Sequence, residues 1–386
     1  MSYTDKLAEN LARRAANDLY RTRRVLNSPQ GTEVNVDGRR MLSFCSNDYL
    51  GLASDPRIID ALKQGAETYG VGSGAAHLLS GHSIAHQELE YALAEFVGRP
   101  RALLFSTGYM ANLGIITALL GRTDEIWEDR LNHASLIDGG LLSRARFRRY
   151  VHANVETLAE SLTRRAATGM RLIATDGVFS MDGDIAPLPE LATIATQHNA
   201  WLMVDDAHGL GVLGATGRGT LEHYGLKIEQ VPILMGTLGK AFGVFGAFVA
   251  GDAVLIETLI QAARSFIYTT ALPPALAMAT LTSLRIVQTE TWRREQLFEH
   301  IKQFRTYAAQ LELPLLPSIT PIQPLLVGSS NQALAWSRHL ETHGILVPAI
   351  RYPTVPKNQS RLRITLSALH TAKQVENLID KLSYYS

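Results

Sequence analysis

The middle of the chain alternates short apolar runs with longer segments of helical periodicity, and this alternation limits the fold more than any other feature of the sequence. Short apolar runs predict buried strands, whereas apolar residues that recur every three or four positions predict amphipathic helices. Strands that alternate with helices form parallel sheets whose crossover helices cover both faces. The expected strands are residues 102–105, 125–127, 147–151, 172–175, 201–204, 233–235 and 247–250, and the expected helices include 109–120, 155–167 and 188–198.

The pattern predicts two further parts outside this region. Residues 5–26 have helical periodicity, with leucine or alanine recurring every fourth position and arginines on the other face. After the Pro273–Pro274 pair, a long helical stretch to about residue 311 precedes short strands (323–327, 362–366) and helices (332–342, 371–382). We therefore expect a helical arm at residues 1–46, a large domain at 47–280 and a smaller C-terminal α/β domain at 281–386.

Composition and charge exclude several classes of protein. The 37 Lys and Arg residues nearly balance 36 Asp and Glu residues, and the net charge of +1 leaves no broad basic surface for nucleic acid. An apolar content of 46% excludes intrinsic disorder, and no apolar run approaches the roughly 20 residues that span a bilayer. Because Cys45 is the one cysteine, the sequence predicts no internal disulfide and no cysteine-built metal site. We expect a cytoplasmic protein without a metal, membrane or nucleic-acid partner.

Two residues that follow predicted strands indicate cofactor chemistry, because doubly wound sheets bind ligands at the carboxyl ends of their strands. Lys240 lies among small residues (236–243), and a desolvated lysine becomes a nucleophile that can form a Schiff base. Asp205 ends an apolar strand and needs a cationic partner, such as the protonated pyridine nitrogen of pyridoxal phosphate (PLP). The alternatives are a surface lysine in a glycine loop and, at Asp205, a magnesium site or a helix cap.

Three other segments carry weaker signals. Gly108 and the two hydroxyl residues before it open a predicted helix, whose backbone N–H groups suit a phosphate, although a plain helix cap has the same pattern. His133 could lie against a flat ring, act in acid–base catalysis or be structural. Arg361 and Arg363 alternate with apolar residues, which places both on one face of a strand, either as a carboxylate clamp or on a solvated edge.

Together these residues and the motifs around them resemble one family. The segments that carry the resemblance are SNDYLG (46–51), DGVFSMDGD (176–184), VDDAHG (204–209), TLGK (237–240) and PTVP (353–356). From about residue 15 to the C-terminus the chain resembles the α-oxoamine synthases, which are PLP-dependent transferases of fold type I (aspartate-aminotransferase-like). The resemblance implies an α/β fold with a mostly parallel seven-stranded sheet, PLP as the cofactor and a homodimer with the active site at the subunit interface.

The resemblance also implies roles for residues around the cofactor ring. Lys240 would carry PLP as a Schiff base, and Asp205 would pair with the pyridine nitrogen. His133 would stack on the ring. Ser180 and His208 would contact the phenolic oxygen of the ring and its surroundings.

A second set of residues is implied in binding the phosphate. Gly108, Tyr109 and Thr237 would hold it, in agreement with the anion site that the helix start at Gly108 predicts independently. Thr269 and Thr270 would reach the phosphate from the other subunit of the homodimer.

Within the family, the chain most resembles the member that serves biotin synthesis. That enzyme condenses L-alanine with a pimeloyl thioester, which is carried by coenzyme A or by an acyl-carrier protein. Asn47 and Arg363 would bind the carboxylate of the amino acid, with His133 also at the substrate. Arg21 and Thr354 would lie near the acyl chain.

Two alternatives stay open. A one-residue shift in the N-terminal alignment makes Arg23 the alternative to Arg21. Tyr352 stands where a proline is more usual in the biotin-pathway member, and a tyrosine there resembles the aminolevulinate-forming sibling. The alternative activity is therefore that of a sibling enzyme that condenses glycine with an acetyl or succinyl thioester.

Overall fold

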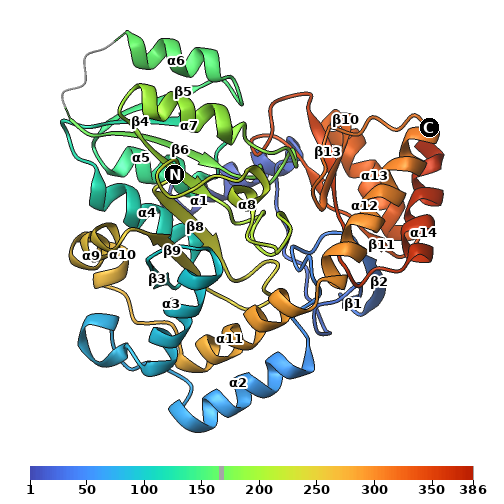
Figure 1. The fold of residues 1–386 in the computed structure, drawn as a ribbon. Coiled ribbons are helices and arrows are strands. Elements are labelled where there is room, and N and C mark those ends of the chain that lie inside the picture. The colour runs from blue at the N-terminus through green and yellow to red at the C-terminus, as the bar shows by residue number, and fades with distance from the viewer. Residues whose placement is uncertain (165–168, 386) are drawn as a thin grey trace. The chain divides into compact units, whose positions relative to one another are not determined.

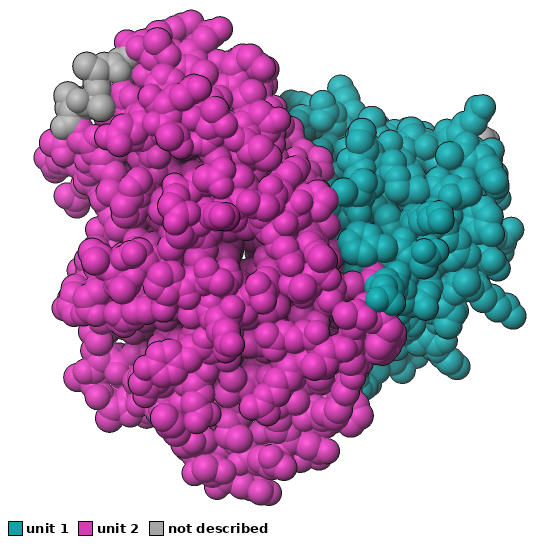
Figure 2. Space-filling model, viewed as in Figure 1, with its two compact units in different colours: residues 1–47, 181–183, 295–386 teal, residues 48–180, 184–294 magenta. Residues whose placement is uncertain are grey.

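The computed structural model describes residues 1–164 and 169–385 of the chain. The described residues form two compact units, which Figure 2 shows in different colours. The first unit comprises residues 1–47, 181–183 and 295–386, and the second comprises residues 48–180 and 184–294. The expected three-part division, with residues 1–46 as a separate arm, stays a prediction.

A seven-stranded sheet forms the centre of the second unit (Figure 1). β9 runs antiparallel to its neighbours β3 and β8, while the pairs from β8 across to β5 are parallel. The seven predicted strands and the mostly parallel sheet are therefore confirmed. The strand order is β3 (Arg101–Phe105), β9 (Ala247–Gly251), β8 (Ile233–Thr237), β7 (Trp201–Asp205), β6 (Arg171–Asp176), β4 (Glu125–Asp129) and β5 (Arg146–Tyr150).

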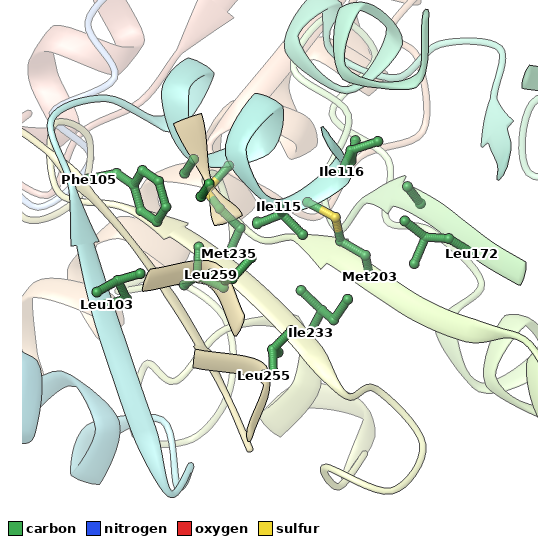
Figure 3. Close-up of a cluster of buried hydrophobic side chains, with 14 of the residues drawn as sticks. Leu103, Phe105, Ile115, Ile116, Leu172, Met203, Ile233, Met235, Leu255 and Leu259 are labelled. Carbon is green, nitrogen blue, oxygen red and sulfur yellow. The ribbon is translucent and has the colours of Figure 1, made fainter. Parts of the chain in front are cut away.

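Helices cover both faces of this sheet, because successive residues of a strand point to opposite sides. Leu172 and Met203 pack in one apolar cluster with side chains of α4 (Gly108–Leu119) and α9 (Ala253–Ala262), as Figure 3 shows. Their strand neighbours Ile173 and Leu202 pack in a second cluster with side chains of α6 (Val155–Thr163) and α7 (Leu188–Gln197). Each fully buried aliphatic side chain contributes about 1.5–3 kcal/mol, so the two clusters hold the strand ends in fixed register.

Further helices of the second unit pack around this core. α11 approaches α2 closely, since a Cβ at Gly65 would lie 2.7 Å from the Cα of Ala275. Glycine at position 65 therefore permits the contact between these two helices. These helices are α2 (Pro56–Tyr69), α3 (Ile84–Phe96), α5 (Ala134–Leu142), α8 (Thr220–Tyr224), α10 (Arg264–Ile267) and α11 (Pro274–Thr289), with a π-helical turn at His77–Gly81.

The first unit contains two small sheets. β2 (Arg39–Ser43) lies between β1 (Glu33–Val36) and β11 (Ile345–Leu346), and β13 (Ser360–Thr365) lies between β10 (Ile322–Gly328) and β12 (Ala349–Ile350). Its helices include α1 (Tyr3–Ala16), α13 (Ser330–Thr342), α14 (Ala372–Leu382) and residues 295–310 of α12 (Trp292–Gln310). Among the described helices, none combines the length and the apolar character that crossing a membrane requires.

Three expected helices have different bounds in the structure. α1 ends at Ala16 instead of residue 26, because Asn17 caps it and Asp18 takes a left-handed conformation with φ of 56°. The stretch from 274 to 311 is two helices, which are separated at residues 290–291. The helix expected at 155–167 ends at Thr163, and residues 165–168 lie outside the described part of the chain.

The hairpin of β1 and β2 is an element that the sequence analysis missed. Its strands are short and carry charged residues, so they lack the apolar runs on which the prediction rests. Asp37 and Gly38 connect them with φ values of 50° and 80°. An Asp-Gly pair with both residues in this region is the usual signal of a two-residue hairpin turn.

A histidine links two carboxyl groups in the second unit. His152, which follows β5, lies 2.9 Å from an oxygen of Asp129 and 2.9 Å from an oxygen of Asp184. Burial lowers the pKa of His152, but the hydrogen bonds to the two carboxylates outweigh it and raise the pKa to about 10. The charged imidazole therefore fastens the segment after β5 to the segment that carries Asp184.

We predict that His152→Gln lowers the melting temperature more at pH 6 than at pH 10. The pKa of about 10 in the folded chain exceeds the ordinary value of 6.5, so the charged imidazole stabilises fully below about pH 6.5 and its contribution disappears as the pH rises through 10. Thermal unfolding at the two pH values measures the difference, with His198→Gln on the same unit as the control. Equal losses at both pH values would contradict a charged His152.

Candidate active site

The predicted cofactor lysine belongs to a chain of three hydrogen-bonded side chains. Nζ of Lys240, just after β8, lies 2.9 Å from Nε2 of His208, which follows the neighbouring strand β7. Nδ1 of His208 lies 2.8 Å from the hydroxyl oxygen of Tyr49. Tyr49 is fully buried, in a turn where Asp48 accepts a hydrogen bond from the N–H of Leu52 at 2.8 Å. The ends of two adjacent strands therefore bring the lysine and the imidazole together, and Tyr49 holds the imidazole through its other nitrogen.

Asp205, the last residue of β7, is buried with a separate donor for each carboxylate oxygen. Oδ1 accepts from the backbone N–H of Ala207 at 3.0 Å, and Oδ2 accepts from the side-chain amide of Asn112 at 2.7 Å. The same amide donates to Oγ of Ser135 at 2.8 Å, and that Oγ lies 2.7 Å from Nδ1 of His133. Asp205 and His133, which sequence analysis treats separately, thus belong to one network.

His133 is held through its backbone as well. It caps α5, and its N–H donates to Oδ2 of Asp176, the last residue of β6, at 2.7 Å. Burial lowers the pKa of His133 below its usual value; Asp205 opposes this effect and Lys240 adds to it. The imidazole is therefore neutral at pH 7.

Two further carboxyl groups are buried beside Asp205. Asp176 pairs with it in the register of β6 and β7, and burial, together with the charge of Asp205, raises the pKa of Asp176 well above its ordinary value. Burial also raises the pKa of Asp206 to about 8. Gly209 and Gly219 enclose the Asp206 carboxyl, since Cβ atoms there would lie 2.1 and 1.9 Å from its oxygens. Asp206 is thus protonated at neutral pH, which limits the negative charge at this end of the sheet.

The start of α4 forms a small cradle. A Cβ at Gly108 would lie 2.7 Å from Cγ2 of Thr237, so the absence of a side chain at position 108 keeps this space clear. Thr107 caps the helix by accepting a hydrogen bond from the N–H of Met110 at 3.2 Å. The hydroxyl of Tyr109 donates to Asp138. The structure therefore places the predicted residues Gly108 and Thr237 side by side at a helix N-terminus, with Tyr109 next to them.

The predicted substrate residues lie in the first unit, in two pairs. Arg363 donates to Oδ1 of Asn47 at 3.1 Å, and Arg21 donates to Oγ1 of Thr354 at 3.4 Å. Arg21 is thus in contact with Thr354, while the choice between Arg21 and Arg23 at the acyl chain stays a prediction. The roles of these four side chains in substrate binding stay predictions.

The alternative of a solvated edge strand for the two arginines of β13 is wrong. β13 is the middle strand of its sheet, and Arg361 and Arg363 are 1% and 6% exposed. Arg361 forms an ion pair with Asp182 at 2.6 Å. Both guanidinium groups are therefore buried with polar partners.

Three other predicted residues lie in the second unit. Thr270 forms an isolated antiparallel bridge with Ala76, and Thr269 precedes it after α10. Ser180 is half-buried, four residues after the end of β6. The contribution of the two threonines to a second subunit, and that of Ser180 to a cofactor, stay predictions.

The structure adds Tyr49, Asn112, Ser135 and Asp176 to the residues that sequence analysis singled out. Asn112 has a usable signal, because it is a fully buried amide in a helix of otherwise apolar character, and a buried amide requires partners. Tyr49 and Asp176 lie inside the motifs that carry the family resemblance. Ser135 has no signal of its own, since a serine in the first turn of a helix is usually only a helix-start residue.

The chain is similar to known proteins over nearly its whole length. Residues 39–382 match the family model described as aminotransferase class I and II. The curated protein named 8-amino-7-oxononanoate synthase from Nitrosococcus oceani is 62% identical over 372 residues, which cover 96% of this chain and 98% of that protein. The protein of the same name from Pseudomonas putida is 61% identical over 377 residues, which cover 98% of this chain and 96% of that protein.

Solved structures with the same fold include two enzymes. A serine palmitoyltransferase from S. paucimobilis with a bound PLP–myriocin aldimine has a TM-score of 0.93 at 31% identity and covers 98% of this chain and 96% of that chain. An 8-amino-7-oxononanoate synthase from Francisella tularensis has a TM-score of 0.79 at 35% identity and covers 89% of this chain and 97% of that chain.

These matches identify the family of the chain and, within it, the group of enzymes to which the chain belongs. The chain belongs to the class I and II aminotransferase family, and within it to the 8-amino-7-oxononanoate synthases. The expected fold type I, the α-oxoamine synthase family and the enzymatic function are confirmed.

We predict that Tyr49→Phe lowers kcat about three- to tenfold, the factor that corresponds to one lost hydrogen bond of roughly 0.5–1.5 kcal/mol. The substitution removes the hydroxyl that contacts Nδ1 of His208 and leaves the buried ring in place. Steady-state kinetics measures the change. Tyr150→Phe, which removes another buried hydroxyl from the same unit, is the matched control. Equal losses in the two variants would mean that the effect is the general cost of removing a buried hydroxyl and does not come from the contact with His208.

Proposed function

We propose that this chain condenses L-alanine with a pimeloyl thioester to give 8-amino-7-oxononanoate, CO2 and the free thiol carrier. Its relatives at more than 60% identity over nearly the whole chain support this reaction, because they are named for that product. The single observation that carries the proposal is the position of Lys240 after β8, next to the strand that ends in the buried Asp205. A lysine and an aspartate in this relation are what PLP chemistry requires.

The residues of the second unit fit PLP as the cofactor. Lys240 supplies the amine that would hold it, and the buried Asp205 suits a protonated pyridine nitrogen. The space beside Gly108, which a Cβ would fill, suits a phosphate at the start of α4. When bound, PLP supplies an electron sink for the pair released at Cα of the amino acid. His133 would lie against its ring, with Ser180 and His208 near the phenolic oxygen.

Lys240 would transfer the protons of the reaction, and its neighbours would orient it or set the charge of the cofactor. Nζ of Lys240 takes the proton from Cα of L-alanine and, after C–C bond formation and loss of CO2, returns a proton to the same carbon. His208, with Tyr49 on its other nitrogen, orients that amine. Asp205 would keep the pyridine nitrogen of the bound cofactor protonated.

Two pairs of side chains would bind the two substrates. Arg363 and Asn47 would hold the carboxylate of alanine, because a buried guanidinium with its fork of N–H groups suits a carboxylate. Arg21 and Thr354 would contact the pimeloyl chain. The thiol carrier would be coenzyme A or an acyl-carrier protein.

The proposed enzyme is a cytoplasmic homodimer. Thr269 and Thr270 would complete the phosphate site of the second subunit. The single, half-buried Cys45 fits a reducing compartment, where proteins rarely depend on disulfides.

An assay of substrate combinations tests the proposal. Purified holoenzyme is given L-alanine, glycine or L-serine, each with a pimeloyl, acetyl or succinyl thioester, and the free thiol is measured. We expect turnover with L-alanine and the pimeloyl thioester, and no turnover by Lys240→Ala. Preference for glycine with the acetyl or succinyl thioester would replace the proposed reaction with that of a sibling enzyme.

We predict that Arg363→Lys raises KM for L-alanine about tenfold, as expected when one hydrogen bond to a charged group, worth roughly 1.5–3 kcal/mol, is partly lost. The lysine keeps the charge but loses the fork that also reaches Asn47. Arg305→Lys is the matched control, since Arg305 is an arginine of the same unit that is hydrogen-bonded to Gln323 and the Leu316 carbonyl. An unchanged KM for L-alanine would remove Arg363 from the carboxylate site.

A further inference from the structure

Four side chains connect the end of β7 with the start of α5. In order they are Asp205, Asn112, Ser135 and His133, joined by contacts of 2.7, 2.8 and 2.7 Å. Asp205, Asn112 and Ser135 are buried, the last two completely. In a buried chain of this kind, the donor and acceptor roles at one end determine the roles along the rest.

The roles begin at the amide of Asn112. Its Nδ2 lies 2.7 Å from a carboxylate oxygen of Asp205 and 2.8 Å from Oγ of Ser135. A reversed amide would place its oxygen against the carboxylate, which offers no proton. The NH2 group therefore donates one hydrogen to Asp205 and the other to Ser135.

Ser135 must then donate toward His133. Its Oγ accepts from Asn112, and an amide nitrogen accepts nothing, so the hydroxyl hydrogen is directed to the remaining neighbour, Nδ1 of His133 at 2.7 Å. The backbone N–H of Ser135 points to the same Nδ1 at 3.3 Å. Two donors meet one ring nitrogen, which must be the unprotonated one.

We propose that Asn112 and Ser135 are positioning residues that hold His133 as the tautomer with its proton on Nε2. Nε2 lies across the ring from the Ser135 contact, so the imidazole offers an N–H donor on the edge turned away from α5. That donor would serve an oxygen of the acyl or amino-acid substrate. The substrate role rests on the proposed function, whereas the tautomer rests on the hydrogen bonds alone.

The charged surroundings of His133 are compatible with this tautomer. Asp205 on β7 and Asp138 on α5 favour protonation, Lys240 after β8 disfavours it, and Asp176 on β6 accepts the backbone N–H of His133. Burial is the largest effect and lowers the pKa of His133. A second proton, on Nδ1, would also remove the acceptor to which the hydroxyl and the backbone N–H of Ser135 donate.

Nuclear magnetic resonance of 15N-histidine-labelled holoenzyme tests the tautomer directly, with His133→Gln to identify the signal. In the wild type at pH 7 we expect Nδ1 of His133 to be unprotonated and Nε2 protonated. Ser135→Ala should give a mixture of tautomers, and Ser135→Thr, which keeps the hydroxyl, should restore one. Ser143→Ala removes a buried hydroxyl at the other end of α5 and should leave the spectrum unchanged. A proton on Nδ1 in the wild type would overturn the proposal without any variant.

Kinetics supplies the second test. Ser135→Ala should lower kcat/KM about three- to tenfold, which is the equivalent of one hydrogen bond. Without the hydroxyl that donates to Nδ1, the neutral imidazole of His133 is less stable. The fall of kcat/KM on the acid side of its pH profile should therefore move to higher pH by about half to one unit. In a His133→Asn background the same substitution should have no further effect on kcat, because Ser135 acts through His133. An unshifted acid limb, or full additivity, would overturn the positioning role. If the tautomer is confirmed but no substrate combination is turned over, the proposed function fails and the assignment of Asn112 and Ser135 stands.

Discussion

Burial of negative charge at the carboxyl ends of adjacent parallel strands is the constraint on which the site depends. Asp176 and Asp205 end neighbouring strands and Asp206 follows directly, and all three are nearly inaccessible to solvent. An uncompensated buried carboxylate costs several kcal/mol, so each needs donors, a cation or a proton. Asp206 takes a proton, Asp176 accepts the N–H of His133, and Asp205 receives Asn112. Asp205 also accepts the backbone N–H of Ala207, so each of its two carboxylate oxygens has a donor.

The helices that follow the strands help to meet this constraint. α4 provides Asn112 to Asp205 and begins with Gly108 at the cradle, while α5 begins with His133 and Ser135. The apolar clusters on both faces fix these helices against the sheet. Because the polar network lies between packed layers, the orientation of each ring and amide follows from the packing around it.

Much of the architecture of the second unit can be predicted from the sequence, because its strands are apolar runs with strong periodicity and its lysine and aspartate follow strand ends. The missing parts have weaker local signals. β1 and β2 are short and charged, and the sequence analysis does not predict them. The helix α1 is predicted, but its expected end lies too late, because the apolar repeat continues past Ala16 although no residue of the helix is buried. The links from Tyr49 to His208 and from Ser135 to Asn112 join residues that are distant in the chain or unremarkable in type. Such contacts depend on tertiary packing, which no local pattern encodes.

The close approach of Gly108 and Thr237 limits which residue can stand at the start of α4. At the start of α4 the backbone lies so close to β8 that no side chain at position 108 fits. A single added methyl group there would lie 2.7 Å from Cγ2 of Thr237. The start of α4 therefore accommodates a side chain at position 108 only if Thr237 moves, so the backbone packing and the proposed phosphate site place the same demand on this residue.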